Sequence, residues 1–134
     1  MISGLVITHG GLGEELVKVV TVILGPIEGL AAQSNRGIGV KELTEAVRGW
    51  VARQVEAGAE GVLLFIDDFG SSCANAAQIA AADGPPTACV TGVNLAMLLD
   101  FVTWRDGLEL PQLARRLVDK GRHAIAIIGP GGGS

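Results

Sequence analysis

The chain has 134 residues and a formal net charge of −4, with ten Lys and Arg residues against fourteen Asp and Glu. This length fits one domain that folds without disulfides or a metal, and the acidic balance argues against a nucleic-acid-binding surface, which needs a basic stripe. Apolar runs such as residues 62–66 are five residues long, whereas a membrane-spanning helix needs about 20. Cys73 and Cys89 have no CxxC spacing, which indicates reduced thiols in a cytoplasmic protein.

The first half of the chain alternates short apolar runs with helical spacing. Residues 2–8 are predicted to form a buried strand. A helix follows it and ends at Gly25-Pro26, and the apolar face of this helix consists of Leu12, Leu16, Val19, Val20 and Ile23. Residues 30–33 predict a weaker strand, followed by a loop over 34–39. A second helix, ending near residue 58, is predicted from the spacing of Leu43, Val47, Trp50, Val51 and Val55.

The second half repeats this alternation. Residues 61–67 form the clearest buried strand, Ser71 and Ser72 are N-cap candidates for an Ala-rich helix over 75–83, and 87–91 is the fourth strand. Asn94 is expected to cap a helix over 95–102. Pro111 begins a helix that buries Leu113, Leu117 and Val118 and ends at Gly121. Residues 123–128 then predict a last strand. The domain would span residues 1–128, with a flexible Gly-rich tail at 129–134.

Strands that alternate with helices predict a parallel sheet covered by helices on both faces. We therefore expect an α/β fold: a three-layer α/β/α sandwich with a mainly parallel, flavodoxin-like sheet in the strand order 2-1-3-4. In that arrangement strands 1 and 3 are neighbours, and ligands gather at their carboxyl ends, where the strand order reverses.

Polar residues follow both of these strands. His9 comes directly after the first strand and Asp67 ends the third, so the two side chains can hydrogen-bond if the strands are about 4.8 Å apart. A carboxylate on one imidazole nitrogen fixes the tautomer and leaves the other nitrogen unprotonated, as a nucleophile requires.

The turns that follow suit an anion. Gly10 leads into the first helix, and Gly70, Ser71 and Ser72 lead into the third. Helix N-termini favour anions, and glycines let the backbone approach closely. The pattern is typical of a phosphohistidine site, with Gly10, Gly70, Ser71 and Ser72 expected to bind the phosphate.

Three motifs carry a resemblance to a known family. They are residues 8–10 (Thr-His-Gly), residues 65–72 (Phe-Ile-Asp-Asp-Phe-Gly-Ser-Ser) with Asn75-Ala76-Ala77, and residues 91–98 (Thr-Gly-Val-Asn-Leu-Ala-Met-Leu). In this order they resemble the mannose-type IIA component of the bacterial phosphoenolpyruvate-dependent sugar phosphotransferase system. The resemblance covers essentially the whole chain.

The resemblance implies a cytoplasmic phosphotransferase without a cofactor. His9 would accept a phosphoryl group from the phosphocarrier protein HPr and pass it to a IIB component for sugar uptake. Asp67 matches the aspartate that hydrogen-bonds the active histidine, and Ser72 matches a serine near the phosphate. The family also implies a homodimer in which the last strand, 123–128, joins the partner's sheet, and association with a membrane IIC/IID complex without insertion.

The chain departs from the family pattern at three positions. Ser71 and Cys73 stand where members commonly carry a Gly and a Pro, and Asp68 adds a carboxylate that would disfavour a phosphoryl group. The chain also ends where many members continue into a IIB domain, so a regulatory module that moves no sugar is the alternative function.

Other candidate residues favour ordinary structural roles. Arg36 is expected to be a solvated loop residue rather than a phosphate contact, and Arg115, Arg116, Lys120 and Arg122 are expected to form a solvated helix face. His123 is interpreted as structural. His9, Asp67 and Asp68 have no fixed ligand spacing, so no metal is expected.

Overall fold

The computed structural model describes residues 1–82 and 84–132, and its strands and helices alternate along the chain. In order they are β1 (Ile2–Thr8), α1 (Leu12–Leu24), β2 (Leu30–Ser34), α2 (Val40–Glu56), β3 (Gly61–Ile66), α3 (Ser72–Ala82), β4 (Thr87–Thr91), α4 (Leu95–Trp104) and α5 (Leu110–His123). The helix predicted over 75–83 thus begins earlier, at Ser72, while Asp83 lies outside the described residues. None of the helices in 1–82 and 84–132 has both the length and the apolar character needed to cross a membrane.

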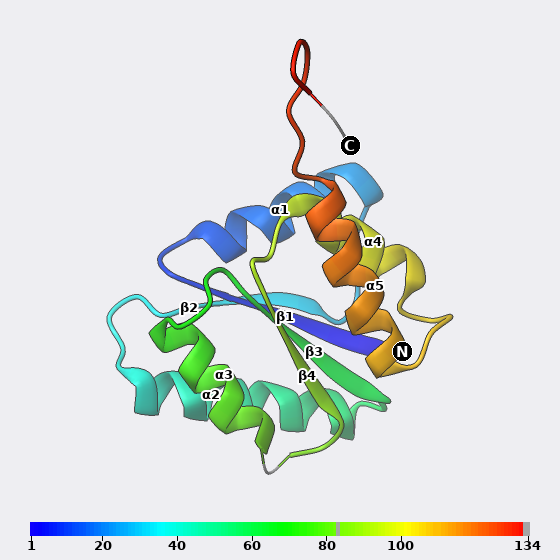
Figure 1. Ribbon diagram of the computed structural model, residues 1–134. Helices are drawn as coiled ribbons and strands as arrows, with labels where there is room; N and C mark the ends of the chain where they lie inside the picture. Colours follow the sequence, from blue (N-terminus) through cyan, green and yellow to red (C-terminus); the bar gives the residue numbers. More distant parts are fainter. Residues whose placement is uncertain (83, 133–134) are drawn as a thin grey trace.

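The four strands form one parallel sheet in the order β2-β1-β3-β4. Helices α1, α4 and α5 cover one face of this sheet, and α2 and α3 cover the other (Figure 1). The predicted α/β sandwich and its strand order are therefore confirmed. Every residue of β1 and β3 is buried, which explains their continuous apolar runs, because a central parallel strand has helices on both sides.

The two layers of the core are packed with side chains of different size. Ala76 and Ala77 of α3 are fully buried against the sheet, and their small side chains let α3 approach closely. On the other face the rings of Phe65 and Phe101 meet edge to face, 5.2 Å between centroids. A Cβ on Gly4 would lie 2.9 Å from the Phe101 ring, so only glycine lets β1 pass beneath this aromatic pair.

Helix α1 is turned differently from its predicted orientation. Of the expected apolar face, Val20 is buried and Leu16 packs partly against the core, whereas Leu12, Val19 and Ile23 are exposed. The periodicity identifies an apolar stripe but not its cover, and in this chain the stripe extends beyond the area that α4 and the sheet bury. Val55 of α2 is likewise exposed rather than on the buried face.

The predicted start of the C-terminal strand is wrong, while the pairing of this segment with a second copy stays a prediction. His123 ends α5 instead of beginning a strand, and residues 125–128 have no strand pairing in the described structure. Gly121 does not end α5 either. It lies inside the helix, where a Cβ would stand 2.7 Å from Met97 Cε of α4, so this glycine serves close packing. Lys120, Arg122 and His123 in the last turn suit the negative end of the helix dipole, which favours continuation of the helix.

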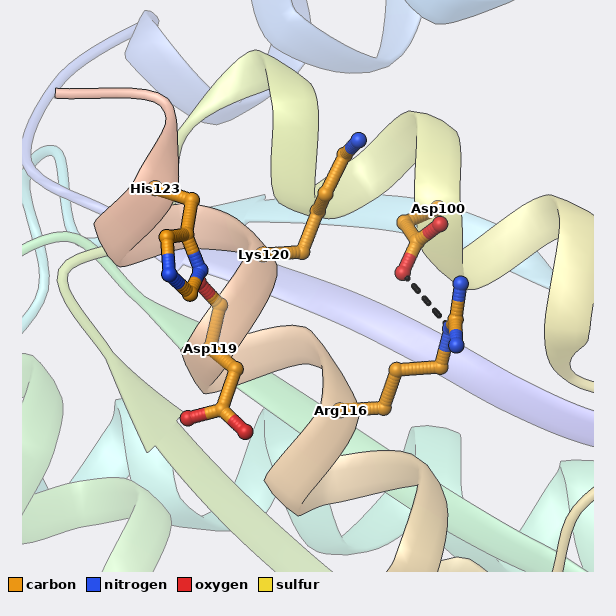
Figure 2. A pocket seen from close by; sticks show the side chains of 5 residues that line it. All are labelled: Asp100, Arg116, Asp119, Lys120 and His123. Atoms are coloured by element: carbon orange, nitrogen blue, oxygen red, sulfur yellow. Dashed lines mark hydrogen bonds and ion pairs between the residues drawn. The ribbon is translucent and has the colours of Figure 1, made fainter. Parts of the chain in front are cut away.

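Polar contacts fix α5 against α4, as Figure 2 shows. Arg116 Nε donates to Asp100 Oδ2 at 3.1 Å, and the same guanidinium lies 4.1 Å from the centre of the Trp104 ring. His123 Nδ1 donates to the Asp119 carbonyl oxygen at 2.7 Å. Arg116 and His123, with Asp100, Asp119 and Lys120, line a cavity of about 350 Å³. Arg116 therefore has a structural role instead of belonging to a fully solvated face, and the structural interpretation of His123 agrees with its contact.

Candidate functional site

The structure brings His9 and Asp67 into direct contact at the carboxyl end of the sheet. Ile7 of β1 is in register with Ile66 of β3, so the residues that follow each strand emerge side by side. The His9 amide N–H donates to Asp67 Oδ2 at 2.9 Å, and the His9 ring Nδ1 lies 2.9 Å from the same oxygen. One carboxylate oxygen thus fixes both the backbone and the ring of His9.

The electrostatics of this pair favour an ionised carboxylate. The Asp67 side chain is 11% exposed and that of His9 is 53% exposed. Burial acts to raise the pKa of the Asp67 carboxyl, but the hydrogen bonds from the His9 amide and ring, with the charge of His9, bring that pKa below its usual value. Ionised Asp67 accepts a hydrogen bond from Nδ1–H, so the ring proton stays on Nδ1 and the lone pair of the neutral ring lies on Nε2.

The turn between β1 and α1 is held by short polar contacts. Gly10 has a φ of +55°, a conformation that other residues rarely adopt, and its amide donates to Asn35 Oδ1 at 3.3 Å. Thr8 Oγ1 accepts from the Gly13 amide at 2.8 Å. The first amides of a helix have no intrahelical partner, so Thr8 satisfies one of them and the Gly10 amide is already engaged.

The turn between β3 and α3 holds the other residues expected at the phosphate. Gly70 has a φ of +80°. Ser71 Oγ donates to the Asp68 carbonyl at 3.0 Å and accepts from the Ala74 amide at 3.2 Å, so Ser71 caps α3. Ser72 is the first residue of α3. The structure therefore places Gly10, Gly70 and Ser71 in the two turns that follow β1 and β3, and Ser72 at the start of α3, with the Ser71 hydroxyl occupied in the cap.

Two residues just beyond the end of β2, Asn35 and Arg36, lie beside the turn between β1 and α1. The Asn35 side chain accepts from Gly10, and the Asn35 backbone N–H donates to the Thr8 carbonyl oxygen at 3.1 Å. The Arg36 Nη2 lies 3.4 Å from the position that a Cβ on Gly10 would take. Sequence reasoning missed Asn35 and gave Arg36 little weight, although the strand order places the end of β2 next to the end of β1.

Cys73 lies beneath the pair and is completely buried. Burial, together with the negative charge of Asp67, raises the pKa of its thiol to about 11, although a hydrogen bond with Ser72 opposes the rise. The thiol is therefore protonated at neutral pH. One donor atom from each of His9, Asp67 and Cys73 lies within 4.8 Å of the other two. Asp68, the other carboxylate of the motif, is exposed.

Comparisons with known proteins point to one family. A family model described as the PTS system fructose IIA component matches residues 4–118. The PTS system mannose-specific EIIAB component of Escherichia coli K12 is 28% identical over 120 residues, covering 88% of this chain but only 36% of that protein, so the chain spans about a third of that relative's length.

Solved structures share the fold. The phosphotransferase system component EIIA from Streptococcus agalactiae gives a TM-score of 0.84 at 19% identity, covering 93% of this chain and 95% of that one. A sigma-54 interaction domain protein from Enterococcus faecalis gives a TM-score of 0.76 at 20% identity, with 92% of each chain covered. At these identities the two likenesses support the architecture alone.

Proposed function

Because the chain belongs to the EIIA-man family of PTS system fructose IIA components, we propose that it is a cytoplasmic phosphohistidine carrier. It accepts a phosphoryl group from HPr on His9 and passes the group to a IIB component for sugar uptake and phosphorylation. The observation that carries this proposal is the double contact of His9 with Asp67 Oδ2, through the amide and through ring Nδ1.

The transfer follows from the tautomer that Asp67 imposes. The Nε2 lone pair attacks the phosphorus of phospho-HPr, an N–P bond to His9 forms as the N–P bond to HPr breaks, and the HPr imidazole leaves. The His9 ring keeps its Nδ1 proton and becomes positively charged, and the Asp67 carboxylate stabilises that charge. Positioning and charge stabilisation supply the catalysis, as is usual for phosphoryl transfer.

The surrounding turns supply positive charge for the phosphoryl oxygens. The N-termini of α1 and α3 both lie beside His9, and their partial positive charge favours an anion. The guanidinium of Arg36 lies over the Gly10 turn, so we assign it to the phosphoryl group as well. We assign Gly70 and Ser72, at the start of α3, to the phosphoryl group as well, while the Ser71 side chain caps the helix.

An apolar rim around these turns suits protein partners. Leu12, Ile38 and Phe69 are all exposed, Phe69 at 79%, and they follow β1, β2 and β3 at the carboxyl end of the sheet. Exposed apolar side chains grouped around a polar centre are typical of protein-binding sites. We assign this rim to the alternating docking of HPr and the IIB component.

A homodimer is part of the proposal. β4 is an edge strand, and its outer edge has no strand partner within residues 1–82 and 84–132. Such an edge can pair with another strand. Ile125, Ile127 and Ile128 are exposed in the segment after α5. A segment of this apolar character would be protected by pairing with the β4 edge of a second copy.

The experiment that tests the proposal is phosphorylation from labelled phosphoenolpyruvate with enzyme I and HPr. We expect an acid-labile, alkali-stable phosphate on the wild-type chain and none on His9→Ala. The matched control is His123→Ala, which removes the other histidine of the chain and should label as the wild type does. Label on His9→Ala would contradict the proposal.

A second candidate function is a regulatory module whose phosphorylation state controls another protein. The fold likeness to a sigma-54 interaction domain protein from Enterococcus faecalis supports this alternative. The two functions differ in the fate of the label. When a IIB component is added to the labelled protein, a carrier loses its phosphoryl group to it, whereas a regulatory module retains the group and changes its affinity for a protein partner.

A further inference from the structure

The group formed by His9, Asp67 and Cys73 contains a feature that phosphoryl transfer does not use. Asp67 Oδ1 is buried without a hydrogen-bond partner in the described structure, although its companion Oδ2 accepts from His9 twice. A buried carboxylate oxygen without a partner is costly. The fully buried Cys73 side chain and the His9 ring lie close to the Asp67 carboxylate, with one donor atom of each residue within 4.8 Å of the others.

These three donors suit a particular class of metal ion. An imidazole nitrogen, a carboxylate oxygen and a sulfur together favour zinc and similar ions, whereas magnesium and calcium prefer oxygen ligands alone. In a tetrahedral zinc site the ligand atoms stand about 3.5 Å apart, given bonds of about 2.0–2.3 Å. The donor atoms, which lie within 4.8 Å of one another, would close to that spacing on binding, and the half-exposed His9 ring leaves room for water as a fourth ligand.

We propose that His9, Asp67 and Cys73 bind one zinc-class divalent cation, and that the bound cation prevents phosphorylation of His9. On binding, the Cys73 thiol releases its proton to solvent and the sulfur joins the ion as thiolate. Two negative ligands then balance the charge of the ion, and the unpartnered Asp67 oxygen gains a partner.

Inhibition follows from the chemistry of imidazole. A cation on Nε2 takes the lone pair that attacks phosphorus. A cation on Nδ1 displaces the ring proton to Nε2, which again removes that lone pair. Either mode leaves His9 without a nucleophilic nitrogen, so the metal and the phosphoryl group exclude one another. The binding half of this inference stands alone, and only its inhibitory half rests on the proposed function.

Titration of the unphosphorylated protein with Cd²⁺ tests the site directly, because thiolate-to-cadmium charge transfer absorbs in the ultraviolet. We expect one ion per chain in the wild type. The two cysteines provide a matched pair: Cys89→Ser should keep the absorbance and Cys73→Ser should lose it. His9→Ala and Asp67→Asn should each weaken binding by more than about tenfold. Absorbance retained in Cys73→Ser, or absent from the wild type, would overturn the site.

A second measurement covers the case in which Cys73→Ser fails to fold. Diethyl pyrocarbonate modifies accessible imidazoles, and Zn²⁺ should protect His9 of the wild-type protein while leaving His123 reactive. If His9 reacted equally fast with and without Zn²⁺, the proposal would be overturned. Phosphate uptake with one equivalent of Zn²⁺ then tests inhibition. If the metal-free protein takes up no phosphate, the proposed function fails, while the cadmium titration still decides the site.

Discussion

The His9–Asp67 corner and the apolar segment 125–128 differ in where their partners lie. The sequence predicts a contact with a distant strand for both: His9 with the end of the third strand, and the C-terminal segment with the sheet of a partner chain. His9 finds Asp67 within the same chain, 58 positions away, with two contacts of 2.9 Å. Residues 125–128 pair with no strand in the described part of the chain, and Ile125 and Ile127 are 79% and 68% exposed.

The difference shows which predictions a single chain can satisfy. The strand order alone brings the ends of β1 and β3 together, so the corner is determined by the fold. The strand order does not place the apolar segment after α5 in the same way. The free edge of β4 can pair with this segment from the same chain or from a second molecule. The corner is complete in one chain, and the segment is complete only in the proposed homodimer.

The largest effect should come from breaking the corner with Asp67→Asn. A neutral amide cannot stabilise the positive charge that the ring acquires on phosphorylation, and where its NH₂ group donates to Nδ1 the ring proton moves to Nε2 and the nucleophile is lost. We expect the initial rate of phosphate uptake from phospho-HPr to fall by about 10²–10⁴-fold. Rapid-quench measurement of labelled protein would record this rate.

The neighbouring carboxylate provides the matched control. Asp68 is exposed, and its backbone carbonyl accepts from Ser71. Asp68→Asn should therefore leave the rate near that of the wild type or raise it slightly, because one negative charge beside the phosphoryl group is removed. Equal losses in the two variants would mean that general charge, and not the His9 contact, controls the rate.

The C-terminal segment is tested by Ile125→Asp combined with Ile127→Asp. Two charges on an apolar strand should prevent its pairing with another chain, so we expect light scattering to show a dimer for the wild type and a monomer for the double variant, with unchanged helical circular dichroism. Val22→Asp, at an exposed apolar position of α1, should remain dimeric. A wild-type monomer at high micromolar concentration would contradict the proposed homodimer.

The sequence predicts the layered fold, the strand order and the contact of His9 with Asp67, because each depends on strand ends that periodicity locates well. Cys73 beneath the pair and Asn35 on the Gly10 amide are not predicted, since their positions depend on side-chain packing at the ends of α3 and β2. The same limit explains α1. The spacing predicts its apolar stripe, but whether other elements bury Leu12 and Ile23 depends on the packing of neighbouring helices, which the spacing does not specify.

The smallest effect concerns how tightly α1 is held against the corner, and Gly13→Ala measures it. A Cβ at Gly13 would stand 3.1 Å from the Val6 carbonyl oxygen and 3.1 Å from Thr8 Oγ1. Because the carbonyl is fixed in the sheet, α1 would have to move away from β1. We expect the free energy of unfolding, measured in urea, to fall by about 1–3 kcal/mol.

Gly49→Ala in α2 is the matched substitution. A Cβ there would stand 3.2 Å from Arg53 Nη1, the mobile end of a long side chain, and alanine favours a helix over glycine by about 1 kcal/mol. This variant should be as stable as the wild type or slightly more so. If Gly13→Ala were equally well tolerated, the close packing of α1 on β1 would not be what holds the Gly10 turn, and the Thr8 and Asn35 hydrogen bonds alone would have to position His9.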